Sequence, residues 1–400
     1  MRRFWFLAVL AADLALVATL TAVPIAQAAF PGQNGKIAYV RLAGGSMEIF
    51  AVNPDGSGEV RLTNNSATED QPTWSPDGTQ IAFTSDRTGS YEVFVMDADG
   101  THVTQLTHKA ATFDWQPAWS PDGEQIAFTR EGGGGQGVFV VPADGGTATK
   151  VLSLAHDPDW SPDGTKIAVS TARTGDLSVE IYAVRPNGTG LTKITSNDRV
   201  DTDPDWSPDG TKIAVSRFDQ GDGQEDMEIW TMNANGSGET KIPDYGPAMW
   251  PAWSPDGTEI AFAGEPEGSS DWDIYRVSVT GGTWTRVTTA ADDDTNPDWG
   301  PGAIAPPVGR SLTLALTDHL TASGKLSSDD GSTACIAEMT VKIQRMTGER
   351  WLTVKSVVTG EGGKYEDSIP DVNGTYRAKA PKVSVAGVVC SKAISDTVTH

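Results

Sequence analysis

Carboxylate side chains recur at a fixed distance before a series of tryptophans, and oxygen ligands of this kind suit Ca²⁺. Five residues before six successive tryptophans, the chain has two alanines and four acids, which are Glu69, Asp114, Asp201 and Asp294. These four acids are candidate Ca²⁺ ligands. The alternative is a solvated acidic rim in a generally acidic protein, because the spacing matches no defined calcium-binding loop.

A second set of side chains stands three residues before the same tryptophans. Side chains two apart on a strand point to the same side, so we expect this set and the first to fringe one opening. The second set is Gln71, Gln116, Asp157, Asp203, Trp250 and Asn296. With their neighbours they give a candidate contact surface for a ligand or partner: Asp70, Trp115, His156, Asp203 and Trp250. For Trp115, His156 and Trp250, packing between repeats is the alternative.

Motifs of known catalytic machinery are missing from the sequence. It has no G-x-S-x-G nucleophile turn, no H-E-x-x-H zinc motif and no phosphate-binding loop. Paired carboxylates keep a carbohydrate-active enzyme as an alternative. In a chain with 53 Asp and Glu residues, however, two acids near each other are expected by chance. We therefore predict that the protein is not an enzyme.

The tryptophans belong to a repeated W-S-P-D-G sequence that must position these side chains. Intact copies lie at residues 74–78, 119–123, 160–164, 206–210 and 253–257, and a degraded copy begins at Trp299. Successive tryptophans are 45, 41, 46, 47 and 46 residues apart, a period typical of repeat architectures. Ser-Pro-Asp-Gly favours a tight turn, so the turn aspartate is interpreted as structural.

Each repeat predicts four short strands. The strand that leads into the tryptophan is followed by an Ile-Ala strand, a strand that begins with an acid, as in Glu92-Val93-Phe94, and a short strand such as Gln105-Leu106-Thr107. The acids of the third strand are interpreted as structural hydrogen-bond acceptors. The first Ile-Ala strand, at Ile37, lacks a tryptophan strand, and Trp299 lacks an Ile-Ala strand. We predict that these two strands pair and close a six-bladed β-propeller with four-stranded antiparallel blades.

The pattern P-x-W-S-P-D-G-x-x-I-A-F, followed by E-V-F-V-M-D-A-D-G and L-T, closely resembles the repeats of TolB-like propellers, which are relatives of WD-repeat proteins. The resemblance covers about residues 30–303 and implies a propeller that binds partners at the mouths of its central channel. We assign residues 29–303 to this domain and residues 304–309, with Pro306-Pro307, to a linker.

Residues 310–400 show alternating apolar positions without the W-S-P-D-G repeat, so the whole chain is predicted to be all-β. The segments around Trp351, Tyr365 and Tyr376 resemble immunoglobulin-like or prealbumin-like β-sandwiches. Cys335 and Cys390 are the chain's two cysteines. In an exported protein they are expected to form one disulfide, and two free buried thiols are the alternative.

The first 28 residues are predicted to be a secretory signal peptide. They begin with Arg2 and Arg3, continue with an apolar stretch and end in Ala26-Gln27-Ala28, a small-x-small cleavage pattern. An uncleaved membrane anchor is the alternative, which Asp13 disfavours. After cleavage we expect no stable membrane insertion and a location outside the cell, in the periplasm or at the cell envelope.

The net charge of −23 excludes nucleic acid as a natural partner, because such a surface repels phosphates. The sequence therefore predicts a secreted, non-enzymatic protein that binds a protein or peptide partner in the cell envelope or outside the cell. The alternative is a glycan-binding protein or carbohydrate-active enzyme that uses acidic residues at the propeller mouth. Ca²⁺ is the only cofactor that the candidate sites suggest.

Overall fold

The computed structural model describes residues 33–399 except 110, 134, 175, 177, 220–226, 244, 303–309, 317–320, 329–338, 348–349, 361–362, 369–374, 381–382, 386–387 and 391–392. The predicted signal peptide, the linker and Cys335 lie outside the described residues, so the disulfide stays a prediction. The described residues form no α-helix. They include no apolar helix long enough to cross a membrane.

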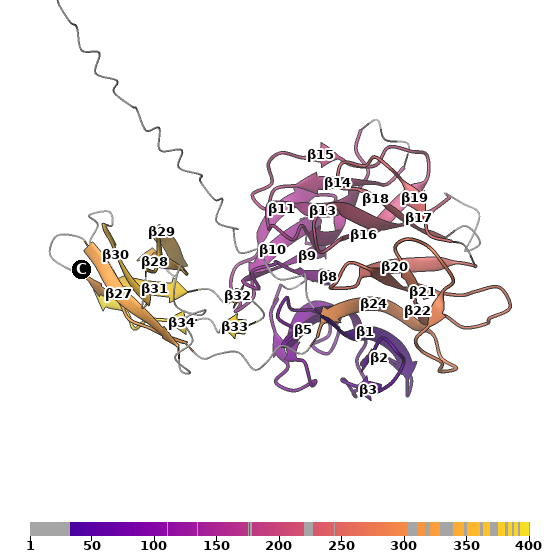
Figure 1. Cartoon of the computed structure of the whole chain (residues 1–400), viewed down its shortest axis with the longest axis horizontal. Coiled ribbons are helices and arrows are strands. Elements are labelled where there is room, and N and C mark those ends of the chain that lie inside the picture. Colours follow the sequence, from indigo (N-terminus) through magenta and orange to yellow (C-terminus); the bar gives the residue numbers. More distant parts are fainter. Residues whose placement is uncertain are drawn as a thin grey trace, which may run out of the picture.

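Six four-stranded antiparallel sheets between Asn34 and Pro301 form the propeller, each with its own row of four strands (Figure 1). Blades 1 to 5 are β4–β7, β8–β11, β12–β15, β16–β19 and β20–β23, and the closing blade is β24-β1-β2-β3. The inner strands, which lead into the tryptophans, are β4 (Glu69–Trp74), β8 (Thr112–Trp119), β12 (His156–Trp160), β16 (Val200–Trp206), β20 (Ala248–Trp253) and β24 (Asp294–Pro301).

The other strands of each blade follow in order from the channel outward. The second strands, which carry Ile-Ala, are β1 (Asn34–Ala43), β5 (Gln80–Ser85), β9 (Gln125–Gly132), β13 (Ile167–Thr171), β17 (Lys212–Phe218) and β21 (Glu259–Gly264). The third strands are β2 (Ser46–Val52), β6 (Glu92–Asp97), β10 (Gly137–Pro142), β14 (Glu180–Val184), β18 (Glu228–Asn233) and β22 (Asp273–Ser278). The outer strands are β3 (Val60–Arg61), β7 (Thr104–Gln105), β11 (Thr149–Ser153), β15 (Thr192–Lys193), β19 (Thr240–Lys241) and β23 (Thr285–Arg286).

The ring is closed by pairing between the first and the last propeller strands. β1 and β24 are antiparallel, with Ile37 opposite Trp299 and Arg41 opposite Asp294. Each inner strand also contacts the inner strands of both neighbouring blades. The all-β propeller and its predicted closure are therefore confirmed.

The W-S-P-D-G turns are held by the hydrogen bonds that their composition predicts. In blade 1 the Ser75 hydroxyl donates to Asp77 Oδ1 at 2.8 Å, and the same oxygen accepts the Thr79 amide at 3.0 Å. Gly78 has a φ of 67°, which glycine adopts at little cost. The other four intact copies repeat the serine–aspartate bond. The turn aspartates are thus structural, as interpreted from the sequence.

The acids of the third strands accept hydrogen bonds from the threonine that follows the outer strand. Thr107 Oγ1 donates to Glu92 at 2.5 Å and accepts the Val93 amide at 3.0 Å, which ties the outer strand to the third. Thr195 and Glu180 repeat the arrangement. The interpretation of these acids as structural acceptors is confirmed.

Gly300 explains why the sixth motif copy departs from W-S-P-D-G. A Cβ atom on Gly300 would lie 2.5 Å from Cγ of Trp74, the tryptophan of the next blade. We expect Gly300→Ser to destabilise the protein by roughly 1–3 kcal/mol in urea unfolding, because overpacking forces neighbouring atoms to shift. Gly360→Ser is the control, since its Cβ meets nothing nearer than 3.8 Å. Equal stability of the two variants would contradict the explanation that Trp74 leaves no room for a side chain at Gly300.

The C-terminal region, residues 310–400, forms two further sheets and a hairpin. One sheet contains β25 (Arg310–Leu312), β26 (Ala315–Leu316), β27 (Thr321–Ser328) and β30 (Lys364–Ser368), and the other contains β28 (Thr340–Thr347), β29 (Arg350–Val358), β31 (Thr375–Ala380), β34 (Ala393–Ile394) and β35 (Val398–Thr399). The hairpin is β32 (Val383–Val385) and β33 (Val388–Cys390). Leu326 of the first sheet and Ile343 of the second share one apolar core, so the two sheets are packed face to face.

Candidate functional site

A β-bulge interrupts every inner strand and decides which side chains reach the channel. In blade 1 the pairing of β4 with β5 shifts between Asp70 and Thr73. The residue three before each tryptophan lies in the bulge, precedes a proline and has a φ between 48° and 56°. These φ values are in the left-handed region. Because none of the six residues is glycine, each conformation costs roughly 1–2 kcal/mol. The bulge adds one residue to each inner strand. The side chains before and after it therefore do not follow the strict alternation expected from the sequence.

The four acids predicted as Ca²⁺ ligands do not gather at the mouth, which corrects that prediction. Each is fully buried and pairs with an arginine. The pairs are Glu69–Arg87 (2.7 Å), Asp114–Arg130 (2.5 Å), Asp201–Arg217 (2.5 Å) and Asp294–Arg41 (2.6 Å). The bulge separates them from the channel-lining side chains, and the arginines neutralise them. Within the described ranges no group of three or more His, Cys, Asp and Glu side chains is placed to hold a metal ion.

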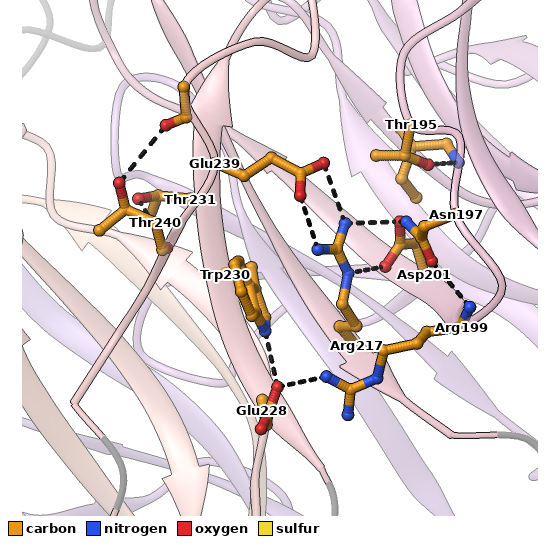
Figure 2. Close-up of polar contacts among 12 residues, drawn as sticks. Thr195, Asn197, Arg199, Asp201, Arg217, Glu228, Trp230, Thr231, Glu239 and Thr240 are labelled. Atoms are coloured by element: carbon orange, nitrogen blue, oxygen red, sulfur yellow. Dashed lines mark hydrogen bonds and ion pairs between the residues drawn. The ribbon is translucent and has the colours of Figure 1, made fainter.

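Blade 4 shows how completely such an acid is engaged (Figure 2). Arg217 binds Asp201 with two nitrogens and also pairs with Glu239 at 2.9 Å. Its guanidinium lies 4.7 Å from the ring centroid of Trp230, a cation–π distance. Asn197 donates to the second Asp201 oxygen at 2.8 Å. Asp201 is therefore a structural residue that has no free face for a ligand.

The second predicted set of side chains does line one space. A channel cavity of about 160 Å³ is bordered by all six residues of that set. Several of them also join neighbouring blades. The backbone amide of Gln116 donates to Gln71 Oε1 at 3.0 Å, and the backbone amide of Asp157 donates to Gln116 Oε1 at 3.3 Å. At Trp250 the acceptor is different, because its backbone amide donates to the Ser216 hydroxyl oxygen at 3.0 Å. Asp203 and Trp250 both border this channel cavity.

A deeper layer of the channel consists of residues directly before the tryptophans, and three of them are aspartates. Asp159, Asp205 and Asp298 each accept the backbone amide of the tryptophan in the next blade, at 2.8, 2.5 and 2.6 Å. They also border a smaller cavity of about 60 Å³ that the tryptophan side chains line. The sequence predictions did not include this layer, although strict alternation along the inner strand places these residues on the same side as the residues two positions earlier.

The channel cavity is strongly acidic. Asp157, Asp159, Asp203, Asp205 and Asp298 border it, and the residues described around it include no Lys, Arg or His. Burial, and then repulsion from Asp157, raises the pKa of Asp203 to about 7. Burial and the nearby Asp298 raise the pKa of Asp159 to about 7, and burial raises that of Asp298 to about 6. The channel therefore holds carboxylates that would gain from a positively charged group.

Three of the predicted contact residues lie outside the cavity lining. Asp70 accepts a hydrogen bond from Asn296 Nδ2 at 2.8 Å and so stands behind the lining. Trp115 is half-buried and its ring centroid is 6.5 Å from that of Tyr91. His156 is half-exposed, with Nδ1 3.6 Å from Glu131. A second aromatic pair, Trp250 and Trp272, has centroids 5.9 Å apart and lies in blade 5.

The comparisons with known proteins agree with this architecture. Over 54 residues the chain is 41% identical to the Tol-Pal system protein TolB of Desulfosudis oleivorans, a match that spans 14% of this chain and only 12% of that protein. The fold is similar to the crystal structure of TolB from Acinetobacter baumannii, with a TM-score of 0.59 and 20% identity over 67% of each chain.

A putative TolB from Agrobacterium tumefaciens is similar with a TM-score of 0.53 and 22% identity, over 68% of this chain and 94% of that one. At these identities the likeness shows the fold. The sequence profile of the TolB beta propeller domain, PD40, matches residues 19–156 and 150–243, more than half of the chain. The chain therefore belongs to the TolB beta propeller domain family.

Proposed function

We propose that this protein is a secreted, non-enzymatic binding protein whose propeller channel receives an extended segment of a protein or peptide partner. The observation that carries the proposal is the acidic channel cavity, in which five aspartates face a space with no described basic side chain. Membership of the TolB beta propeller family supports a role in protein interaction. The predicted signal peptide supports a location in the cell envelope or outside the cell.

The cavity's chemistry favours a partner segment with a basic side chain. Asp203 and Trp250 occupy neighbouring blades on its border, so a carboxylate and an aromatic surface are available together. A lysine or arginine side chain suits both, since a cation is attracted to carboxylates and to aromatic faces. A volume of about 160 Å³ admits a side chain or a few water molecules rather than a folded domain.

We expect Asp203→Asn/Trp250→Ala to abolish capture of the partner from envelope extracts and culture fluid by the full-length mature chain. The substitution removes one cavity charge and the largest side chain on its border while leaving the arginine-paired acids intact. The measurement is enrichment in a pull-down followed by mass spectrometry, and the captured protein is then titrated by calorimetry.

The control for this experiment is Asp99→Asn/Leu191→Ala, which changes an exposed turn aspartate and an exposed apolar side chain outside the channel. It should retain capture. Undiminished capture by the channel variant would rule out this site.

A glycan is the second candidate ligand, favoured by the aromatic pairs Tyr91–Trp115 and Trp250–Trp272, because sugar rings stack on aromatic faces. A polysaccharide panel separates the candidates. Release of reducing sugar that is lost in Asp203→Asn would identify a carbohydrate-active enzyme, and retention without release would identify glycan binding.

A further inference from the structure

The C-terminal region contacts the propeller through one glutamate of blade 2. Glu124 lies in the turn between β8 and β9, and its Oε2 is 3.1 Å from Lys342 Nζ. Its Oε1 is 3.3 Å from Lys379 Nζ. The exposed fractions of the Glu124, Lys379 and Lys342 side chains are 15%, 13% and 30%, so the contact is partly shielded from solvent. In Figure 1 the C-terminal strands lie to one side of the ring.

Glu124 departs from the repeat at this contact position. The four other intact motif copies carry threonine directly after W-S-P-D-G, namely Thr79, Thr165, Thr211 and Thr258. In each copy the threonine hydroxyl donates to the turn aspartate at 2.7–2.8 Å. Blade 2 gives up this hydrogen bond and presents a carboxylate to the C-terminal region instead.

The two lysines lie opposite each other on neighbouring strands, so their positive charges repel each other unless an anion lies between them. Lys342 of β28 and Lys379 of β31 are direct partners in the register of the antiparallel pair. Like charges directly opposite each other on neighbouring strands destabilise a sheet. The Glu124 carboxylate offers one oxygen to each ammonium group and so relieves this repulsion. Burial lowers the pKa of Arg377 on β31, and the Asp144 carboxylate, in the turn after β10 of the same blade, partly offsets this by stabilising the guanidinium charge.

The charge of the two parts of the chain is also complementary. Residues 310–400 contain 11 Lys and Arg against 10 Asp and Glu, whereas the whole chain has 30 against 53. The excess negative charge therefore lies before residue 310. Lys342 and Lys379 of the C-terminal region are attracted to this acidic remainder, and the strength of the attraction depends on salt because the ion pairs are not fully buried.

We propose that Glu124 anchors a reversible electrostatic latch that holds the C-terminal region against blade 2, and that loss of its two lysine pairs releases the region. The latch lies in the turn after β8, and Glu124 does not line the channel cavity, which β8 borders with Gln116, Pro117 and Ala118. It is therefore separate from the bulge-lined channel cavity, and its release frees Lys342 and Lys379 for another acidic surface.

The latch is tested by small-angle X-ray scattering of the full mature chain at low salt and at about 1 M salt, where the Debye length is roughly 3 Å. The wild type should be compact at low salt and expand at high salt. Glu124→Thr should already be expanded at low salt and show no further expansion. Because this substitution restores the repeat's own threonine, thermal unfolding of the propeller should be unchanged or shifted upward. An equal low-salt radius of gyration for wild type and variant would overturn the proposal.

Two further variants separate the latch from a general effect of charge. Thr165→Glu puts a glutamate at the same turn position of blade 3, and it should leave the wild-type scattering unchanged. The exchange Glu124→Lys/Lys342→Glu/Lys379→Glu reverses every charge of the contact and should restore the compact form. If the charge-reversed chain is folded by circular dichroism yet expanded at low salt, the pairing of these three residues is refuted.

Discussion

Arg217→Thr is expected to lower the free energy of unfolding by about 3–5 kcal/mol, because it leaves the fully buried Asp201 carboxylate without its main partner. Asp201→Ala should cost a similar amount by leaving the buried guanidinium with Glu239 alone. The double variant Asp201→Ala/Arg217→Thr should lose much less than the sum of the two, since it leaves no buried charge unpaired.

The protein contains the precedent for this double variant. Blade 3 carries Ala155 and Thr171 at the corresponding positions, and both are buried. Blade 5 carries Ala248 opposite Gly264. Acid and arginine are therefore present together at these positions in blades 2 and 4 and in the closing blade, and absent together in blades 3 and 5, whereas in blade 1 Glu69 lies opposite Ser85 and pairs with Arg87. Chemical unfolding of the four proteins of the cycle measures the coupling, which we expect to be about 2–3 kcal/mol. Additive losses would contradict the assignment of Asp201 and Arg217 as a single unit.

Thermal stability is expected to rise as the pH falls from about 8 to about 5, because the folded channel raises the pKa of its aspartates. Asp159 and Asp203 have pKa values of about 7 and Asp298 of about 6, against an ordinary value of 3.8 for an aspartate. The folded state therefore binds these protons more tightly than the unfolded chain does. The resulting stabilisation is fully present below about pH 4 and is lost as the pH rises through 6 to 7.

Asp205→Asn should flatten this pH dependence. Burial and the neighbouring Asp159 hold the pKa of Asp205 well above its usual value, and an asparagine oxygen can still accept the Trp253 amide. We expect a gain in stability at pH 8, where the substitution removes a buried charge, and little change near pH 5, where the raised pKa keeps Asp205 protonated in the folded state. Differential scanning calorimetry across this pH range is the measurement.

Asp209→Asn is the control of opposite sign for the channel variant. Hydrogen bonds from Ser207 and Thr211 outweigh the burial of this turn aspartate and lower its pKa. Its charged form stabilises the fold above about pH 4, so the substitution should reduce stability at pH 8. A loss of stability at pH 8 in Asp205→Asn as well would show that the channel carboxylates are not repelling one another.

Local turn chemistry was enough to predict the propeller, whereas the channel needed the structure. Ser-Pro-Asp-Gly indicates a tight turn and Ile-Ala a strand from local sequence alone. The incomplete repeats at Ile37 and Trp299 predicted that β1 pairs with β24. The candidate site rested on strict alternation, which fails at a bulge. As a result Asp201 was grouped with Asp203, although an arginine neutralises the first and the second borders the channel cavity.

Two signals in the sequence point to the actual arrangement. Each bulge residue precedes a proline, as Gln71 precedes Pro72, and proline restricts the conformation of the residue before it. The buried acids also vary together with arginines: Asp114 accompanies Arg130 and Asp201 accompanies Arg217, each 16 residues later. Comparison of the repeats with one another, rather than inspection of a single strand, would have separated the structural acids from the channel acids.

The pairing of β1 with β24 also bears on how the chain folds. Arg41 and Asp294, which meet across this pair, are 253 residues apart in the sequence. Contacts of such long range form slowly, because the entropy of closing the loop is lost before the contact contributes. During synthesis, the closing blade has no inner strand until residues 294–301 have emerged. Until then β1 presents an unpaired edge, so the growing chain passes through a stage prone to edge-to-edge association, and closing the ring ends it.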